Sequence, residues 1–398
     1  MNLPQATEFL LSHRKAEDEF FKSFKSGRFH HSWLIAGPRG IGKATLAYRI
    51  ARYLFSRGSP DLLKRLNLKI AAAPALESAR FEDDEGDGDG LSVFGDFEAA
   101  PAKAAPSGRL AELDGSPLKV SRANPVFGRM LAGGITDFRV VEREWADAGK
   151  TRRRTEITVD QIRGLKEFFS VTASEDGYRV GLVDSVDEMN ANAANALLKI
   201  LEEPPDAAVL LLVCHGLGGI LPTIKSRCRI LKLSPVGADD MRDLLGEYLP
   251  DVPAADIERL IAVSGGSVGG ALSMHSLGGL ALFGTVSRVA SEMLAGRGAG
   301  VLEVVDRVGG REDMFAIFKS AFSRFADGAI RLKSGLEVGP ASVEEKAALE
   351  ALAARAGCID SLFRFRDGVL GGFDLAASLN LDITASVASA FERLRYVR

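Results

Sequence analysis

A glycine-rich turn between a strand pattern and a helix pattern constrains this chain most strongly. Residues 32–36 (Ser-Trp-Leu-Ile-Ala) are a short run typical of a buried strand, and residues 43–55 have the spacing of an amphipathic helix. The turn between them fits G-x-x-x-x-G-K and consists of Gly37, Pro38, Arg39, Gly40, Ile41, Gly42 and Lys43. This order predicts the opening unit of a parallel α/β sheet.

The residue types in this turn predict a phosphate-binding loop. Its glycines let backbone N–H groups approach phosphate oxygens, and Lys43 would reach the β- and γ-phosphates. The pattern requires Ser or Thr at the next position to hold Mg²⁺, but this chain has Ala44 there. Thr45 follows, about 100° further around the helix. We therefore expect an ATP site that is weak or vestigial, with Mg²⁺ binding in question.

Further strand and helix patterns alternate as far as residue 235. Strands are predicted at 138–141, 156–159, 178–184, 209–214 and 228–233, and helices at 160–170 and 191–202. An N-terminal helix is expected over about 5–27. Such alternation favours a mostly parallel sheet with helices on both faces. Residues 71–125 interrupt it with Ala, Gly, Pro and acidic residues, which predicts a disordered insertion.

The remaining chain has helical patterns only. Short helices fit residues 237–275 and longer amphipathic ones fit 278–396, with a capping-box start at Ser342. We therefore expect an α/β domain at 1–235, a small helical lid domain at 236–277 and a larger helical domain at 278–398.

Composition excludes several classes of protein. Lys and Arg number 50 against 53 Asp and Glu, a net charge of −3, so no basic footprint for nucleic acid covers the whole chain. No apolar run approaches the length of a membrane span, and the first residues lack a signal-peptide core. The three cysteines form neither a disulfide framework nor a Cys-rich zinc site. A cytoplasmic location is expected.

The predicted strand at 178–184 ends in Asp184, the kind of acid that helps hold Mg²⁺ in nucleotide sites of this layout. An ATPase of this type needs a Glu at the next position to polarise the attacking water, and this chain has Ser185. A serine hydroxyl is a poor base near neutral pH. Glu188, three residues further on, is not expected to replace that Glu.

Two motifs carry a specific family resemblance. The segment NALLKILEEPP at 195–205, followed by Ser226-Arg227-Cys228, resembles the clamp-loader branch of the AAA+ proteins. The similarity is sharp over residues 30–45 and 178–233 and weaker in the helical remainder. It implies a hetero-pentamer with other loader subunits that places a sliding clamp on primed DNA. It also implies that Arg227 reaches the ATP site of a neighbouring subunit.

Departures from that family pattern concern hydrolysis. Active loader subunits carry Asp-Glu at the position of Asp184-Ser185. They also carry an arginine at the end of a Gly-Ser-x-Arg segment of the lid, and the matching segment of this chain has Gly269 at that position. Many relatives hold zinc through four cysteines that are missing here. Together with Ala44, these losses imply a subunit that resembles a motor without turning over ATP. The alternatives are an active AAA+ ATPase, as a loader motor or helicase loader, and a free-standing nucleotide-dependent regulator.

Overall fold

The computed structural model describes residues 4–26, 29–57, 110, 113–146, 153–171, 177–298, 300–339, 342–379 and 381–397. By their contacts the residues form two compact units. The sheet unit comprises residues 2–36 and 44–232, and the helical unit comprises residues 37–43 and 233–398. The phosphate loop thus belongs, by its contacts, to the helical unit, although it is continuous in sequence with the sheet unit.

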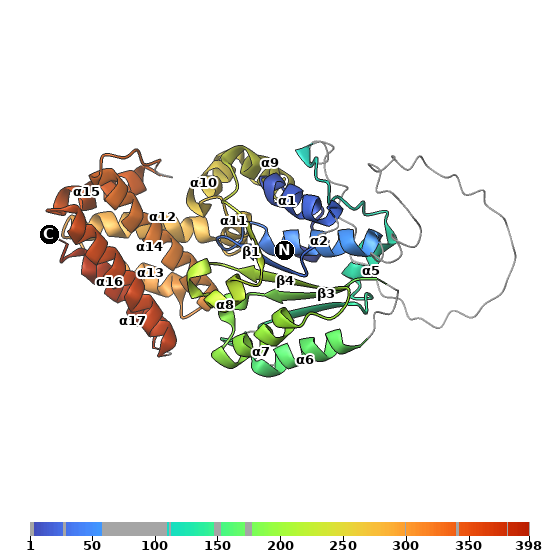
Figure 1. Cartoon of the computed structure of the whole chain (residues 1–398). Helices are drawn as coiled ribbons and strands as arrows, with labels where there is room; N and C mark the ends of the chain where they lie inside the picture. Colours follow the sequence, from blue (N-terminus) through green and yellow to red (C-terminus); the bar gives the residue numbers. More distant parts are fainter. Residues whose placement is uncertain are drawn as a thin grey trace, which may run out of the picture. The chain divides into compact units, whose positions relative to one another are not determined.

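The sheet unit is built on five parallel strands in the order β2-β3-β4-β1-β5 (Figure 1). The strands are β1 (Ser32–Ala36), β2 (Phe138–Glu142), β3 (Arg179–Asp184), β4 (Ala208–Cys214) and β5 (Arg229–Lys232). β1 and β4 are buried along their whole length, as expected for central strands covered on both faces. The predicted parallel α/β fold is confirmed.

Helices cover both faces of this sheet (Figure 1). One face packs against α6 (Val159–Ser170) and α7 (Ala191–Glu202), through side chains such as Leu165 and Leu197. On the other side lie α1 (Arg14–Lys25) and α2 (Lys43–Arg57), where Phe20 stacks 4.9 Å from Trp33 of β1. Shorter elements complete the unit: η1 (Pro4–Ala6), α5 (Pro125–Leu131), η2 (Val186–Glu188), η3 (Leu217–Gly219) and α8 (Pro222–Lys225).

Two predicted elements of this unit were wrong. Residues 156–159 form no strand, because Thr158 is the N-cap of α6 and makes a capping box with Gln161. The N-terminal helix begins at Arg14 rather than near residue 5. Arg52 of α2 donates to the backbone oxygens of Gln5 and Thr7, and these contacts hold the preceding residues outside the helix.

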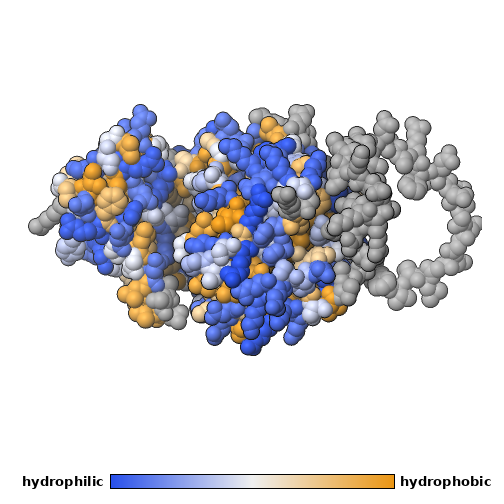
Figure 2. All heavy atoms as spheres, viewed as in Figure 1, coloured by the Kyte–Doolittle hydropathy of each residue, from blue (hydrophilic) through white to orange (hydrophobic). Residues whose placement is uncertain are grey.

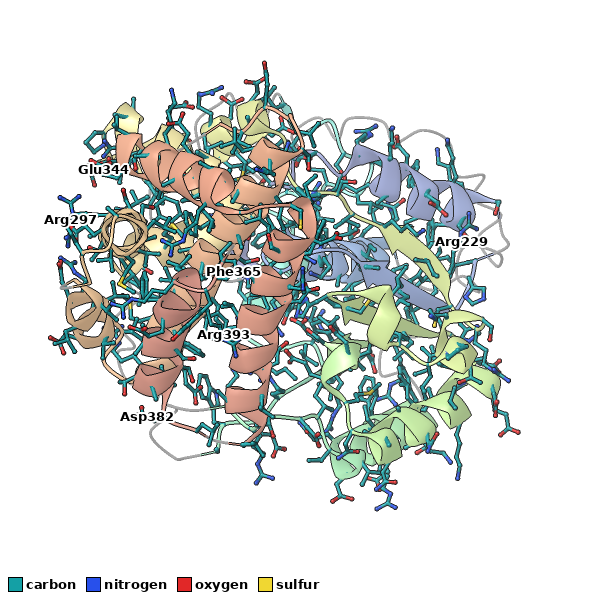
Figure 3. The ribbon with its side chains drawn as sticks, turned by 90° about the vertical axis from the view of Figure 1, so that its left-hand side faces the viewer. Arg229, Arg297, Glu344, Phe365, Asp382 and Arg393 are labelled. Carbon is teal, nitrogen blue, oxygen red and sulfur yellow. The ribbon has the colours of Figure 1, made fainter. Side chains whose placement is uncertain are left out.

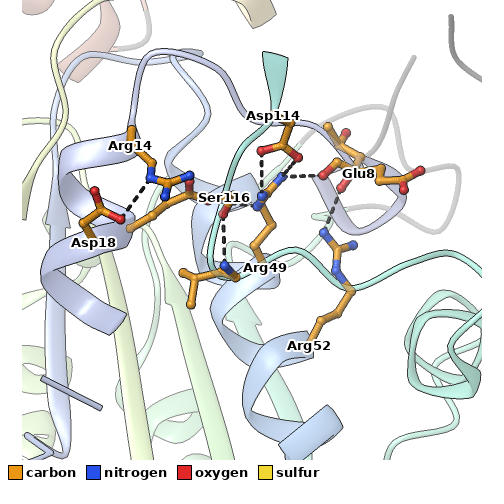
Figure 4. A network of polar contacts seen from close by, with 10 residues as sticks. Glu8, Arg14, Asp18, Arg49, Arg52, Asp114 and Ser116 are labelled. Atoms are coloured by element: carbon orange, nitrogen blue, oxygen red, sulfur yellow. Dashed lines mark hydrogen bonds and ion pairs between the residues drawn. The ribbon is translucent and has the colours of Figure 1, made fainter. Parts of the chain in front are cut away.

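The end of the predicted insertion packs on the sheet unit. Most of residues 71–125 lie outside the described part of the chain, but Leu118 and Val120 are buried. Asp114 forms a two-bond ion pair with Arg49 of α2, at 3.0 and 3.1 Å (Figure 4). Glu17 of α1 lies 3.0 Å from the same guanidinium. Burial raises the pKa of Glu17 even beside this arginine. The residues after 113 therefore belong to the folded unit.

The helical unit begins with three lid helices, α9 (Ala238–Tyr248), α10 (Ala254–Ser264) and α11 (Val268–Ser276). Six more follow: α12 (Gly279–Leu294), α13 (Val301–Val308), α14 (Glu312–Lys333), α15 (Val343–Arg355), α16 (Ile359–Ser378) and α17 (Ile383–Leu394). Phenylalanines at helical spacing on α14 form the core of this part; Phe318 and Phe322 both contact Phe373 and Phe391. α15 starts after Ser342, whose hydroxyl accepts from the Glu345 N–H, as predicted.

Candidate functional site

The phosphate loop between β1 and α2 depends on three glycines. Gly37, Gly40 and Gly42 have φ values of 156°, 73° and 103°, a region that side-chain-bearing residues rarely adopt. A Cβ on Gly37 would lie 2.5 Å from the Leu233 carbonyl oxygen, so glycine is also required by packing. These turns satisfy the backbone requirement of the predicted phosphate-binding loop.

Lys43 lies folded back on this loop. Its side chain is buried, and Nζ donates to the backbone oxygen of Pro38. A phosphate would have to compete with this contact for the ammonium group. Thr45, the second hydroxyl position predicted from the sequence, is buried, and Ala44 supplies no hydroxyl. The loop therefore offers a cation and amides for phosphate but no evident hydroxyl for Mg²⁺.

The lid lies directly on the loop within the helical unit. Ser267, the N-cap of α11, donates from Oγ to the backbone oxygen of Arg39 at 3.0 Å. The N–H of Gly269 donates to the backbone oxygen of Gly40 at 2.8 Å. A Cβ at position 269 would lie 3.1 Å from the Gly40 Cα, so the position for which the family resemblance implies an arginine in active subunits is in close backbone contact. The loop and the lid are thereby joined by two hydrogen bonds.

At the end of β3, a hydroxyl takes the position of the water-polarising carboxylate. Ser185 is buried, and its Oγ donates to Oδ1 of Asp184 at 3.0 Å. The same Oγ lies 2.9 Å from Nε2 of His215, which follows β4 and whose backbone N–H donates to Asp187. Glu188 pairs with an arginine, Arg143, at 2.8 Å. No carboxylate therefore takes over the role of the missing Glu through these contacts.

Metal ligands do not gather in the part of the chain that the structure describes. No group of three or more His, Cys, Asp or Glu side chains there is arranged to hold a metal ion. Weak Mg²⁺ binding at the loop therefore remains a prediction from the sequence.

Arg227 lies in the turn between α8 and β5. Its Nη2 is 2.9 Å from Oε1 of Glu202, and its Nη1 donates to the backbone oxygen of Thr223 at 3.1 Å. The side chain keeps 37% of its exposure. The neighbouring Cys228 is half-buried, and burial, with the nearby Cys214, raises the pKa of its thiol to about 12. Of the Ser-Arg-Cys motif, Arg227 is the residue available for a charge interaction.

Three consecutive arginines, Arg152 to Arg154, precede α6 in the sequence, and two of them pair with nearby carboxylates. Arg152 lies outside the described residues, and Arg153 pairs with Glu142 at 3.0 Å and lies over the ring of Trp145. Arg154 is 3.7 Å from Glu144. Ion pairs this exposed contribute about 1 kcal/mol or less, so both arginines remain accessible to solvent.

Sequence reasoning missed the partners of three residues. The contact of Ser267 with Arg39 joins residues 228 positions apart, and that of Ser185 with His215 joins residues 30 apart. The ion pair of Arg227 with Glu202 was not foreseen either. No local periodicity specifies such pairs, because they depend on the packing of separate elements.

Comparisons with known proteins give matches to subunits of DNA polymerase III. Residues 125–237 match the family model described as "DNA polymerase III, delta subunit". The delta' subunit of DNA polymerase III from Pseudomonas aeruginosa is 43% identical over 150 residues, which cover 37% of this chain and 43% of that protein. The gamma subunit from Buchnera aphidicola (subsp. Schizaphis graminum) is 23% identical over 246 residues, which cover 62% of this chain and 50% of that protein.

Among solved structures, a gamma-subunit-related protein from Thermotoga maritima is 20% identical to this chain. The match covers 66% of this chain and 83% of that protein, with a TM-score of 0.32. The matches to the two curated subunits span half of their length or less. Within the part of the chain that the structure describes, no helix is long and apolar enough to cross a bilayer. Together with the phosphate loop and the parallel sheet, these matches show that part of the chain is similar to the delta' and gamma subunits of DNA polymerase III, as the clamp-loader resemblance of the sequence motifs predicted.

Proposed function

We propose that this chain is a delta-prime-type subunit of a DNA polymerase III clamp loader. It assembles with the motor and delta subunits in a hetero-pentamer, and through that complex it acts on the sliding clamp and primed DNA. It does not itself hydrolyse ATP, and it supplies Arg227 to the nucleotide site of a neighbouring ATPase subunit. Its place of work is the cytoplasm, where replication proceeds.

The observation that carries this proposal is the contact between Ser185 and Asp184. In an ATPase of this layout a carboxylate next to Asp184 would take up the proton of the attacking water. Here a buried hydroxyl is present instead, and it is hydrogen-bonded to Asp184 and His215. A neutral hydroxyl cannot accept that proton near neutral pH, so the subunit lacks the group on which turnover depends.

The phosphate loop fits a nucleotide only in part. Its backbone amides and Lys43 are the groups that would hold the phosphates, and a bound ATP would supply a γ-phosphoryl group there. Lys43 is engaged by the Pro38 oxygen, and Gly269 replaces the lid arginine. The proposal is therefore a weak or vestigial site that serves the architecture of the subunit, without zinc and with little help from Mg²⁺.

The C-terminal helices carry the features of an assembly surface. Large apolar side chains are exposed on and beside them: Leu302, Leu336, Val343, Phe363, Leu375, Leu379, Leu381 and Tyr396. Figure 2 shows hydrophobic patches on this part of the visible face. α16 and α17, which carry the labelled Phe365 and Arg393 in Figure 3, border a groove of about 640 Å³. Exposed apolar surface of this kind supports contacts with other subunits.

A second candidate, an active AAA+ ATPase, is favoured by the complete Gly37–Lys43 pattern and by the match to a gamma subunit. Ser185 and Gly269 are the two residues that separate the candidates. Phosphate release by the pure chain tests them directly. The proposal predicts a rate indistinguishable from that of Lys43→Ala. A turnover of about 1 s⁻¹, within the ordinary range for enzymes, that is abolished by Lys43→Ala would establish the second candidate.

A further inference from the structure

Glu202 holds the side chain of Arg227 at the surface of the sheet unit. α7 ends at Glu202, and its Oε1 lies 2.9 Å from Nη2 of the arginine. On the other side, Nη1 donates to the backbone oxygen of Thr223 at 3.1 Å. The side chain of Glu202 is 48% exposed and that of Arg227 is 37% exposed, so the pair is accessible to a partner.

The geometry leaves the guanidinium of Arg227 able to bind an anion while it is held. A guanidinium carries five N–H groups and is charged at any physiological pH. The carboxylate of Glu202 and the oxygen of Thr223 each engage one Nη, so Nε–H and one N–H on each Nη remain available. Contacts from two sides also remove rotamer freedom from a long side chain before it meets its target.

Two neighbouring residues, Glu203 and Arg229, differ from Glu202 and Arg227 in their partners or position. Glu203 is the C-cap residue of α7 and exposed, and it forms no ion pair among the described residues. Arg229 on β5 forms an ion pair of similar exposure with Glu19, at 3.1 Å, on another part of the sheet unit (Figure 3). These residues supply a matched glutamate and a matched arginine for comparison.

We propose that Glu202 is the positioning residue for Arg227: its carboxylate fixes the guanidinium at the surface with donors directed to the phosphate oxygens of a neighbouring subunit's nucleotide. This inference rests on the proposed function of Arg227. The opposite role, in which the carboxylate competes with the phosphates and restrains the arginine, predicts a change of the opposite sign when the charge of Glu202 is removed.

The test uses a loader reconstituted from the full chain and its partner subunits. The quantity measured is the Arg227-dependent part of DNA-stimulated ATP hydrolysis, that is, the wild-type rate minus the rate with Arg227→Ala. Glu202→Gln should lower this part about 1.4- to 5-fold, the factor that corresponds to the 0.2–1 kcal/mol of an exposed ion pair. Glu203→Gln should leave it unchanged. In the Arg227→Ala background, Glu202→Gln should have no further effect.

A second measurement on the isolated chain does not depend on partners. The NMR order parameter of the Arg227 Nε–H bond should fall in Glu202→Gln and stay at the wild-type value in Glu203→Gln. Such a fall shows that the carboxylate orders the arginine, which a general effect of Glu202 on stability would not produce.

The outcomes separate this inference from the proposed function. If Arg227→Ala leaves hydrolysis at the wild-type rate, the proposed function fails and the inference fails with it. If Arg227→Ala slows hydrolysis but Glu202→Gln does not, the inference alone is overturned. The inference is likewise overturned if Glu202→Gln speeds hydrolysis. It is also overturned if Glu202→Gln slows hydrolysis by the same amount in the wild-type and in the Arg227→Ala background.

Discussion

Gly269 of the lid lies against Gly40 of the phosphate loop, with the Gly269 N–H donating to the Gly40 oxygen at 2.8 Å. The clamp-loader resemblance implies an arginine at the matching lid position of active subunits. In this chain a Cβ at 269 would lie 3.1 Å from the Gly40 Cα and 3.3 Å from its oxygen. This backbone contact leaves little room for a side chain at position 269.

Restoring that arginine should damage the lid rather than restore hydrolysis. Gly269→Arg is expected to lower the free energy of unfolding by about 1–3 kcal/mol, because the added atoms crowd backbone that cannot easily move. Gly246 on α9 offers a matched control, since a Cβ there has nothing within 4 Å. Gly246→Arg should be neutral or stabilising by up to about 1 kcal/mol through helix propensity. Urea unfolding of both variants measures the difference, and equal effects would contradict the tight contact.

Asp114 should contribute to the free energy of unfolding, although it lies within the segment 71–125 that the sequence predicts to be a disordered insertion. Asp114→Ala leaves the buried Arg49 with Glu17 as its remaining carboxylate, so we expect a loss of about 3 kcal/mol, at the low end for a broken buried pair. The exposed pair of Arg14 and Asp18 is the control, and Asp18→Ala should cost less than about 1 kcal/mol. Urea unfolding measures both variants. A smaller loss of unfolding free energy in Asp114→Ala than in Asp18→Ala would show that Asp114 does not stabilise the fold.

The sequence predicted those parts of the molecule that local patterns specify. The turn from Gly37 to Lys43 requires particular backbone angles, and the apolar run ending at Asp184 suits only a buried strand, so both were found. Residues 156–159 have β-branched character, but the capping interaction of Thr158 with Gln161 outweighs it and starts a helix.

Contacts between distant elements were beyond such patterns. Asp114 follows a stretch rich in Gly, Pro and acidic residues, and only its burial against Arg49, 65 positions away, shows that it is part of the fold. Likewise, the loss of an arginine at Gly269 was visible in the sequence, whereas its close contact with Gly40 was not. Side chains whose partners come from another element need the tertiary structure to be interpreted.

The cysteines should differ in reactivity. Cys358 is exposed, and hydrogen bonding with the backbone and side chain of Ser361 lowers the pKa of its thiol. Burial raises the pKa of Cys228 to about 12, and Cys214 is buried. Iodoacetamide should therefore modify Cys358 first in the native protein, because the thiolate is the reactive form. Peptide mass spectrometry measures the order, with urea-unfolded protein as the control in which all three react. Early labelling of Cys228 would contradict its burial.

The central claim is that Arg227 acts on the nucleotide of a neighbouring subunit, and the DNA-stimulated ATPase rate of the assembled loader tests it most directly. An arginine finger contributes about 10³–10⁵ in rate at the site it serves. Arg227→Ala removes the arginine from one nucleotide site only. The variant should therefore still assemble, and the DNA-stimulated ATPase rate of the complex should fall only partly. Arg229→Ala, which removes a similarly exposed and paired arginine, should leave the rate unchanged. An assembled Arg227→Ala complex that hydrolyses ATP at the wild-type rate would contradict the account.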